Sequence, residues 1–86
     1  MYQIGFTDSA RRFVERPDAP LQRRLRRCFQ LLQTEPRRHP NIVLLRGEFA
    51  GHYRFRVGDY RVVYCIHERQ QLIEITEIGH RRDIYR

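Results

Sequence analysis

Apolar and polar residues alternate along residues 52–66, HYRFRVGDYRVVYCI, which predicts two antiparallel strands joined by a tight turn at Gly58-Asp59. Glycine and aspartate tolerate the positive φ angles that such turns require. If Val57 faces Tyr60, the register of the whole hairpin is fixed. One face then carries the apolar residues Tyr53, Phe55, Val57, Tyr60, Val62, Tyr64 and Ile66. The other face carries His52, Arg54, Arg56, Arg61 and Val63.

Two helices are predicted ahead of this hairpin. The first spans about residues 8–16, after a short strand over residues 2–6 and a Thr7-Asp8-Ser9 cap, and ends near Pro17. The second begins around Pro20, a residue that suits a first helical turn, and ends at Pro36. Its inward stripe recurs at helical spacing and consists of Leu21, Leu25, Cys28, Phe29 and Leu32.

The order of elements predicts an α+β domain. A loop over residues 35–41 leads through residues 42–51 into the hairpin, and residues 72–78 form a further strand with Ile73 and Ile75 on one face. We expect a small, mainly antiparallel sheet, built from the N-terminal strand and a C-terminal three-strand meander, with the two N-terminal helices packed on one face. Residues 1–86 show no linker or repeat and are interpreted as a single domain.

The charge of the chain favours a polyanionic partner. The net charge is +7, and all 17 residues counted as lysine or arginine are arginines. Arginine forms planar, bidentate hydrogen bonds with phosphate and stacks on bases, so RNA, DNA or an acidic protein is expected to bind. A genome rich in G and C could explain the choice of arginine over lysine, but not the net positive charge.

Several classes of protein are not favoured by this sequence. No apolar run approaches a membrane span, and the N-terminus lacks the pattern of a secretory signal, so we expect a cytoplasmic protein that does not bind membranes. Cys28 and Cys65 are not expected to form a disulfide there. The histidines at positions 39, 52, 67 and 80 match no metal-ligand spacing, so neither a metal nor another cofactor is predicted.

The arginine face of the predicted hairpin is the candidate binding surface. The helices should cover the apolar face, which leaves the arginine face open. Arg56 would lie directly across from Arg61, and like charges opposed on a sheet are destabilising, so a bound anion is expected to accompany them. Alternatively, these long side chains extend into solvent and have no function.

The segment LRGEFAGHYRFRVGDYRVVYCI, together with the tail GHRRDIYR, resembles the RelE/ParE superfamily of bacterial toxins, and is closest to its RelE-like branch. The resemblance covers nearly the whole chain. It implies a toxin that is neutralised by an acidic antitoxin in a hetero-oligomer. RelE-like members enter the ribosomal A site and cleave messenger RNA by attack of a 2′-hydroxyl on the adjacent phosphate. ParE-like members share the fold and inhibit DNA gyrase.

Catalytic residues follow from this resemblance by position: Arg54, Arg56, Arg61, Arg81 and Tyr85. The best-known RelE-type proteins have lysine where this chain has Arg54 and Arg56. Because arginine effectively never loses its proton, these two residues can stabilise a charged transition state but are poor general bases. His80 and Tyr85 are therefore the candidates for proton transfer, with His52 on the arginine face as a further one. Each histidine could instead be structural.

RNA contacts are expected from two further groups of residues, which are His52 and Arg82 near the strand arginines and Arg23, Arg26 and Arg27 on the second helix. The leading interpretation is a ribosome-dependent endoribonuclease that acts on messenger RNA. A gyrase inhibitor is the alternative, because a shared fold does not decide function. An inactive module that binds nucleic acid or sequesters an antitoxin is the third hypothesis, since the lysines are missing.

Overall fold

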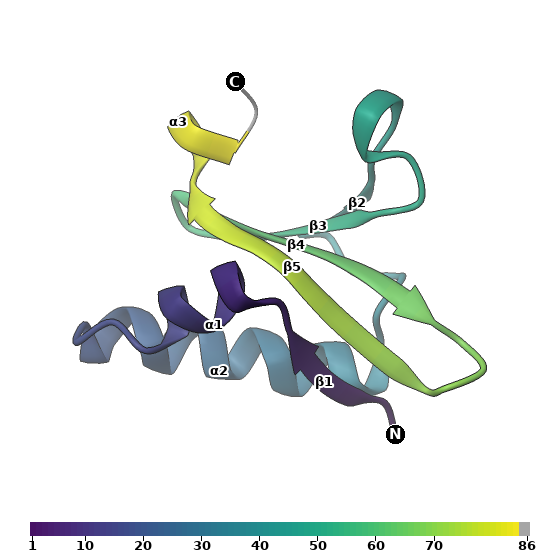
Figure 1. Ribbon diagram of the computed structural model, residues 1–86, viewed down its shortest axis with the longest axis horizontal. Coiled ribbons are helices and arrows are strands. Elements are labelled where there is room, and N and C mark those ends of the chain that lie inside the picture. Colours follow the sequence, from purple (N-terminus) through teal and green to yellow (C-terminus); the bar gives the residue numbers. More distant parts are fainter. Residues whose placement is uncertain (85–86) are drawn as a thin grey trace.

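The computed structural model describes residues 1–84, and it is an α+β fold (Figure 1). Strand β1 (Gln3–Phe6) is followed by helices α1 (Asp8–Val14) and α2 (Ala19–Thr34). Strand β2 (Ile42–Leu44) and the short 3-10 helix η1 (Gly47–Phe49) come next. The chain continues with β3 (Tyr53–Val57), β4 (Tyr60–His67), β5 (Leu72–His80) and the one-turn helix α3 (Arg81–Ile84). In the part of the chain described, no helix is both long and apolar enough to cross a membrane.

The five strands form one mixed sheet in the order β1-β5-β4-β3-β2. The sheet is mainly antiparallel, as expected, except at its first strand, where β1 pairs parallel to β5, with Gln3 opposite Leu72 and Phe6 opposite Ile75. The predicted three-strand meander also gains a fourth strand, because β2 pairs antiparallel with β3. This added strand has only three residues, and Val43 and Leu44 are exposed, so its sequence carries no clear alternation.

The register predicted for the central hairpin is confirmed. Val57 lies opposite Tyr60, and Arg56 lies opposite Arg61. Gly58 occupies the turn with a φ of +59°, in the left-handed region that glycine enters without steric cost. The pairings at the far end, Phe55 with Val62 and Tyr53 with Tyr64, also follow the expectation.

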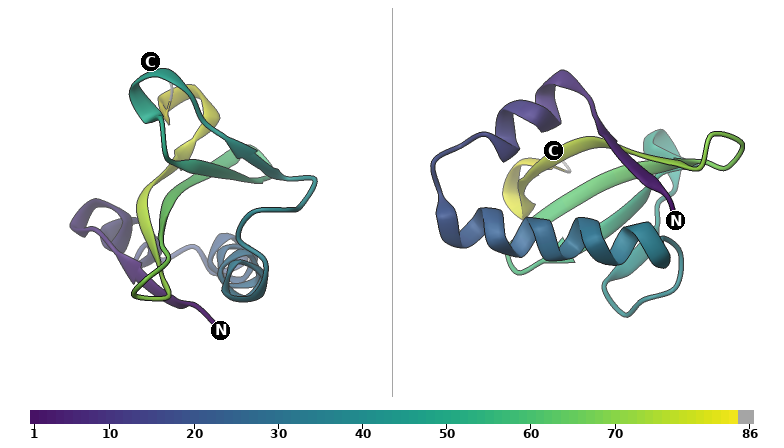
Figure 2. Two further views of the ribbon diagram at one scale, coloured as in Figure 1. Left: turned by 90° about the vertical axis from the view of Figure 1, so that its right-hand side faces the viewer. Right: turned by 90° about the horizontal axis from the view of Figure 1, so that it is seen from below.

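Helices α1 and α2 both lie below the sheet in Figure 1, and Figure 2 shows them from two further directions. Thr7 caps α1 by accepting the Ala10 N–H, and Asp18 caps α2 by accepting the Leu21 N–H. Four residues of the predicted α2 stripe are buried, and the fifth, Phe29, is partly buried and meets Phe6 edge-on. These helix residues pack with the sheet residues into one core: Phe55, Val57, Val62, Tyr64, Ile73, Ile75 and Ile78.

Two short segments lie on the opposite side of the sheet, where a bare arginine face was expected. Figure 1 shows α3 at the end of β5 and η1 beyond β2, both on the side away from α1 and α2. Ile84 of α3 packs so closely on Gly79 that a Cβ atom added at Gly79 would lie 3.1 Å from Ile84 Cδ1. Val63, on the arginine side of β4, is only 1% exposed. This face is therefore covered in part, and the exposed arginines lie toward its edges.

Candidate functional site

Arginine side chains from α2 and β4 meet at the Gly58-Asp59 turn of the β3–β4 hairpin. Arg61 folds back on the turn, and its Nη1 donates hydrogen bonds of 3.0 Å to the carbonyl oxygens of Gly58 and Tyr60. Arg24 comes from α2, and its guanidinium lies so close to Gly58 that an added Cβ atom would collide with it. Glycine at position 58 is thus required both for the turn and for the approach of Arg24.

Arginines from β3 and α3 reach the same turn. Arg81 donates its backbone N–H to the Asp59 carbonyl oxygen at 2.8 Å, and its Nε lies 4.0 Å from Asp59 Oδ1. Arg56 stands opposite Arg61 in the ladder. We call the four residues Arg24, Arg56, Arg61 and Arg81 the tip cluster. The Arg81–Asp59 ion pair is exposed, with side chains 62% and 68% accessible, so it contributes little to stability and leaves the cluster strongly cationic.

A cavity of about 310 Å³ between α2 and β3 extends the tip cluster toward the helix. Arg24 and Arg27 line it from α2, and Arg56 lines it from β3. No carboxylate contributes to this lining among the residues described, so the hollow carries a uniformly positive charge. Arg56 of the sheet therefore shares this cavity with two of the helical arginines, which were predicted as a separate patch.

His39 is the histidine that lines this cavity, and sequence reasoning had set it aside as a loop residue. Its ring lies 5.2 Å from the ring of Phe55, and its Nδ1 accepts the N–H of Asn41 at 3.0 Å. With Nδ1 acting as acceptor, a neutral ring carries its proton on Nε2. Nothing in the spacing of the sequence marks His39, because its position depends on the path of the loop after α2.

The other helical arginines of the predicted RNA surface face a different direction. Arg23 and Arg26 line a hollow at the α1–α2 junction together with Arg16 and Asp18. The single basic patch expected on the second helix is thus divided. Arg27 lines the cavity beside the tip cluster, whereas Arg23 and Arg26 line the hollow at the α1–α2 junction.

Arg54 lies one row further along the sheet, opposite Val63. Its Nε atom is buried and has no hydrogen-bond partner among residues 1–84. His52, which precedes β3, has a buried Nδ1 atom in the same condition. A buried donor without a partner is costly, so such atoms point to a contact made by a ligand, water or another part of the chain.

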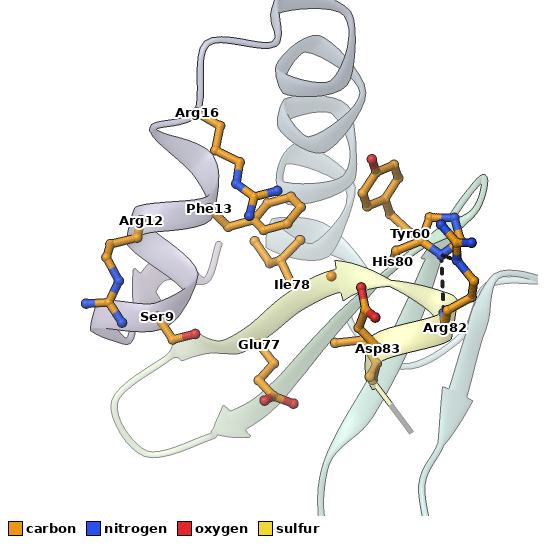
Figure 3. Close-up of a pocket in the computed structure, with 12 residues that line it drawn as sticks. Ser9, Arg12, Phe13, Arg16, Tyr60, Glu77, Ile78, His80, Arg82 and Asp83 are labelled. Atoms are coloured by element: carbon orange, nitrogen blue, oxygen red, sulfur yellow. Dashed lines mark hydrogen bonds between the residues drawn. The ribbon is translucent and has the colours of Figure 1, made fainter. Parts of the chain in front are cut away.

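His80 lies on the side of the sheet that α1 and α2 cover, directly before Arg81 of the tip cluster. It is the last residue of β5 and pairs with Tyr60, and its ring meets the Tyr60 ring edge-on at 5.6 Å. Figure 3 shows it in a pocket of about 670 Å³ between α1 and the end of β5. Its Nδ1 accepts the backbone N–H of Arg82 at 3.2 Å, so the ring is held in place by its neighbour.

The structure thus brings together Arg56, Arg61 and Arg81 of the predicted catalytic set, keeps Arg54 nearby, and places His80 opposite Tyr60 on the face that α1 and α2 cover. Arg82 lines the His80 pocket. Tyr85, the remaining candidate, lies outside the described residues.

A second group of chemically active side chains lies near the turn that joins β4 to β5, at the end of β4 opposite to the tip cluster. His67 Nε2 lies 3.0 Å from Glu74 Oε1, and the Cys65 thiol lies 3.5 Å from each of these atoms. The hydrogen bond from His67 holds the pKa of Glu74 below its ordinary value, while burial and the contact with Glu74 raise the pKa of Cys65. The Cys65-x-His67 spacing, which places both side chains on one strand face, was the available sequence signal.

Comparison with known proteins identifies the family of this fold and site. A profile of the family described as the ParE toxin of type II toxin-antitoxin systems, parDE, matches residues 4–85. The chain belongs to the RelE/ParE toxin superfamily. It is a type II toxin, and the matched stretch includes the whole tip cluster.

Relatives of this RelE/ParE toxin cover nearly its full length. Toxin RelG of Mycobacterium tuberculosis is 36% identical over 86 residues, which is 99% of this chain and 97% of RelG. The toxin–antitoxin complex RelBE2 of the same organism contains a chain that is 29% identical, with a TM-score of 0.77, covering 92% of this toxin and 96% of that chain. The YoeB/ParE toxin from Agrobacterium tumefaciens shares the fold, with a TM-score of 0.83 at 21% identity over 93% of this toxin and 98% of that chain.

Proposed function

We propose that this toxin is a ribosome-dependent endoribonuclease that cleaves messenger RNA at the tip cluster. The single observation that carries the proposal is the convergence of arginines from α2, β3, β4 and α3 on one hairpin turn. A phosphodiester under attack acquires extra negative charge on its non-bridging oxygens. Fixed guanidinium groups directed at that charge stabilise the transition state more than the ground state.

The reaction is an in-line displacement within the RNA strand. The 2′-oxygen of one nucleotide forms a bond to the adjacent phosphorus, and the bond from phosphorus to the 5′-oxygen of the next nucleotide breaks. The 2′-hydroxyl gives up its proton to an acceptor, and the leaving 5′-oxygen takes up a proton. The products are a 2′,3′-cyclic phosphate and a 5′-hydroxyl end. Arg61 and Arg81 are proposed to hold the non-bridging oxygens, with Arg56 supporting the ground-state phosphate.

Proton transfer needs a group other than arginine, because a guanidinium keeps its proton. Tyr85 is proposed as the acceptor or as a base-stacking residue, since it matches the C-terminal tyrosine of RelE-like members. His80 is a second candidate, because it directly precedes Arg81 and its ring meets that of Tyr60 beside the hairpin turn. His39 lines the same cavity as Arg56, and we propose that it donates its Nε2 proton to a phosphate held there.

Binding to the ribosome is proposed to use the helical arginines. Arg27 shares the cavity with the tip cluster, and Arg23 and Arg26 present a second positive surface near the α1–α2 junction. Phosphate contacts from these residues would make binding fall steeply with salt concentration. Single-stranded RNA at the tip and ribosomal RNA along α2 could therefore be held at the same time.

An acidic antitoxin is proposed as the protein partner, in a hetero-oligomer. Solved relatives include the RelBE2 complex already described and the RelE–RelB complex from Pyrococcus horikoshii, the latter 24% identical with a TM-score of 0.79. The net charge of +7 favours association with an acidic chain. Such a chain would mask the tip cluster or displace the C-terminal tail.

A gyrase inhibitor is the second candidate function, favoured by the ParE description of the matching family profile. The two candidates differ in what they damage. Induced expression followed by mapping of RNA 5′ ends and DNA breaks in the same cells separates them. An endoribonuclease produces new RNA ends within translated messages and leaves the DNA intact. DNA breaks with intact messages would refute the RNA proposal and support gyrase.

The variants Arg61→Ala and Arg81→Ala test the role of the tip cluster. Removing a group that stabilises transition-state charge costs about 10²–10³ in rate, so both variants should lose cleavage by that amount. Arg69→Ala is the matched control, because it removes the same charge from the exposed turn at the opposite end of β4. Cleavage that is unchanged in both tip variants, or reduced equally in the control, would contradict the assignment.

A further inference from the structure

Three side chains with metal-binding atoms lie together on the sheet face that carries Arg54 and Val63. Cys65 and His67 come from β4, two residues apart and therefore on one face, and Glu74 is the β5 residue opposite Cys65. The sulfur, the Nε2 nitrogen and a carboxylate oxygen all lie within 4.8 Å of one another. Each residue offers a different kind of donor atom, and the proposed RNA chemistry uses none of the three.

The distances between these atoms match one face of a tetrahedral zinc site. With zinc bonds of about 2.3 Å to sulfur, about 2.0 Å to nitrogen and about 2.0 Å to oxygen, tetrahedral angles place sulfur about 3.5 Å from the other two donors and nitrogen about 3.3 Å from oxygen. The observed separations are 3.5 Å from Cys65 Sγ to His67 Nε2, 3.5 Å from Cys65 Sγ to Glu74 Oε1, and 3.0 Å from His67 Nε2 to Glu74 Oε1. Only small side-chain movements are needed to bring all three donor atoms to bonding distance from one zinc ion.

We propose that Cys65, His67 and Glu74 bind a zinc ion. Thiolate, imidazole and carboxylate together suit zinc, whereas magnesium and calcium prefer oxygen ligands alone. The thiol proton is released to solvent when the sulfur binds the metal. The side chains of His67 and Glu74 are 41% and 39% exposed, so an ion can enter from solvent.

The fourth coordination position has a candidate ligand within the chain. His52 precedes Tyr53, and Tyr53 pairs with Tyr64, so His52 comes level with Cys65 at the end of the hairpin. Its Nδ1 atom is buried and has no hydrogen-bond partner in the described part of the chain. If the His52 ring turns toward the ion, His52 completes the tetrahedral coordination. If it does not, a water molecule is expected to be the fourth ligand.

The zinc site is separate from the tip cluster, and its test does not depend on RNA cleavage. Cys65 is four residues beyond Arg61 on β4, which corresponds to about 13 Å along the strand. A bound ion would connect β4 to β5 near their shared turn and would neutralise the charge of Glu74. The expected result is a more stable hairpin end and a more positive sheet face.

Titration of the untagged, full-length toxin with cobalt(II) and then zinc(II) tests the proposal. Cobalt(II) should produce thiolate-to-metal charge-transfer absorption in the near ultraviolet that saturates at one equivalent, and zinc(II) should abolish it by displacement. Calorimetry should give the same stoichiometry for zinc(II) and no binding of magnesium(II). The melting temperature should rise with zinc(II), because a ligand that binds only the folded state stabilises it.

Matched variants assign the ligands. Cys65→Ser, His67→Gln and Glu74→Gln should each weaken zinc binding by about tenfold or more, and Cys65→Ser should also remove the charge-transfer band. Cys28→Ser and His39→Gln remove the same atom types elsewhere and should leave binding unchanged. Absence of the band in the unaltered toxin, or equal loss in Cys28→Ser and Cys65→Ser, would overturn the proposal and leave the three residues as a hydrogen-bonded cluster. Circular dichroism of each metal-free variant shows whether a loss of binding reflects unfolding.

Discussion

Replacing Tyr64 with phenylalanine should lower the free energy of unfolding by about 1–3 kcal/mol. Tyr64 is fully buried, and its hydroxyl donates a 2.7 Å hydrogen bond to the carbonyl oxygen of Pro36. The substitution removes the hydroxyl, so the Pro36 carbonyl oxygen loses this hydrogen bond. The phenyl ring still fills the same space, and the stack on Tyr53, with ring centroids 5.7 Å apart, is retained. The loss therefore comes from one hydrogen bond and not from a cavity.

Tyr53→Phe is the control for this prediction. Tyr53 lies beside Tyr64 on the neighbouring strand, but it is only partly buried, and its hydroxyl contacts the exposed Arg37. Because water can replace that contact, we expect a loss below about 1 kcal/mol. Urea unfolding followed by circular dichroism measures both values, and the melting temperature of Tyr64→Phe should fall by about 4–8 °C for each kcal/mol lost. Equal stability of Tyr64→Phe and the unaltered toxin, or equal losses in both variants, would refute the reasoning.

Two further predictions concern Cys28 and Gly58. Burial raises the pKa of Cys28 to about 12, whereas the unfolded chain releases this proton near pH 8.5, so unfolding free energy should fall as pH rises from about 9 to about 12. Urea titrations at several pH values should show that the unfolding free energy of Cys28→Ala falls less steeply with pH than that of the unaltered toxin. An identical fall in both proteins would contradict this cause. Gly58→Ala should destabilise the toxin by about 1–2 kcal/mol because of its left-handed backbone, and should displace Arg24 from the tip cluster. Retained stability together with retained RNA cleavage would refute both parts.

The central hairpin could be predicted because its determinants are local. The turn residues and the alternation of residues 52–66 fix the register without reference to the rest of the chain, and the structure has that register. The two helices followed for the same reason, from caps and from helical spacing. The parallel pairing of β1 with β5 did not follow, because it joins residues nearly seventy positions apart.

The position of His80 shows how one irregularity changes a site. Along β5, strict alternation from Ile73 and Ile75 would place residue 80 on the arginine face. The register shifts between Val63 and Tyr64, so that Tyr64 pairs with Ile75 and Val63 pairs with Glu77. Thr76 has no residue opposite it on β4 at this bulge. Every later residue of β5 therefore lies on the face opposite to the one that strict alternation predicts. Ile78 therefore enters the core, and His80 lies on the same face as Tyr60.

The convergence of Arg24 and His39 on the hairpin also could not be predicted from the sequence. Helical spacing places Arg24 beside the buried stripe, three residues after Leu21 and four before Cys28, but it does not say which strand Arg24 meets. The rotation of α2 is set by the packing of Leu21, Leu25, Cys28 and Leu32 against the sheet, which directs Arg24 and Arg27 toward β3. A site built from three or more elements depends on such packing, and only its hairpin portion could be predicted locally.

Because the chain has no lysine, the proposed site separates the stabilisation of charge from the transfer of protons. The tip cluster contains only guanidinium groups, whose charge stays constant throughout the pH range in which the protein is folded. If the cluster stabilises the transition state as proposed, that contribution does not change with pH, and any change in the rate of the chemical step reports the proton donor and acceptor alone. A rate that rises toward high pH indicates an acceptor such as the Tyr85 phenol, with an ordinary pKa near 10. A rate that rises to a plateau near neutral pH would indicate a histidine as the acceptor instead.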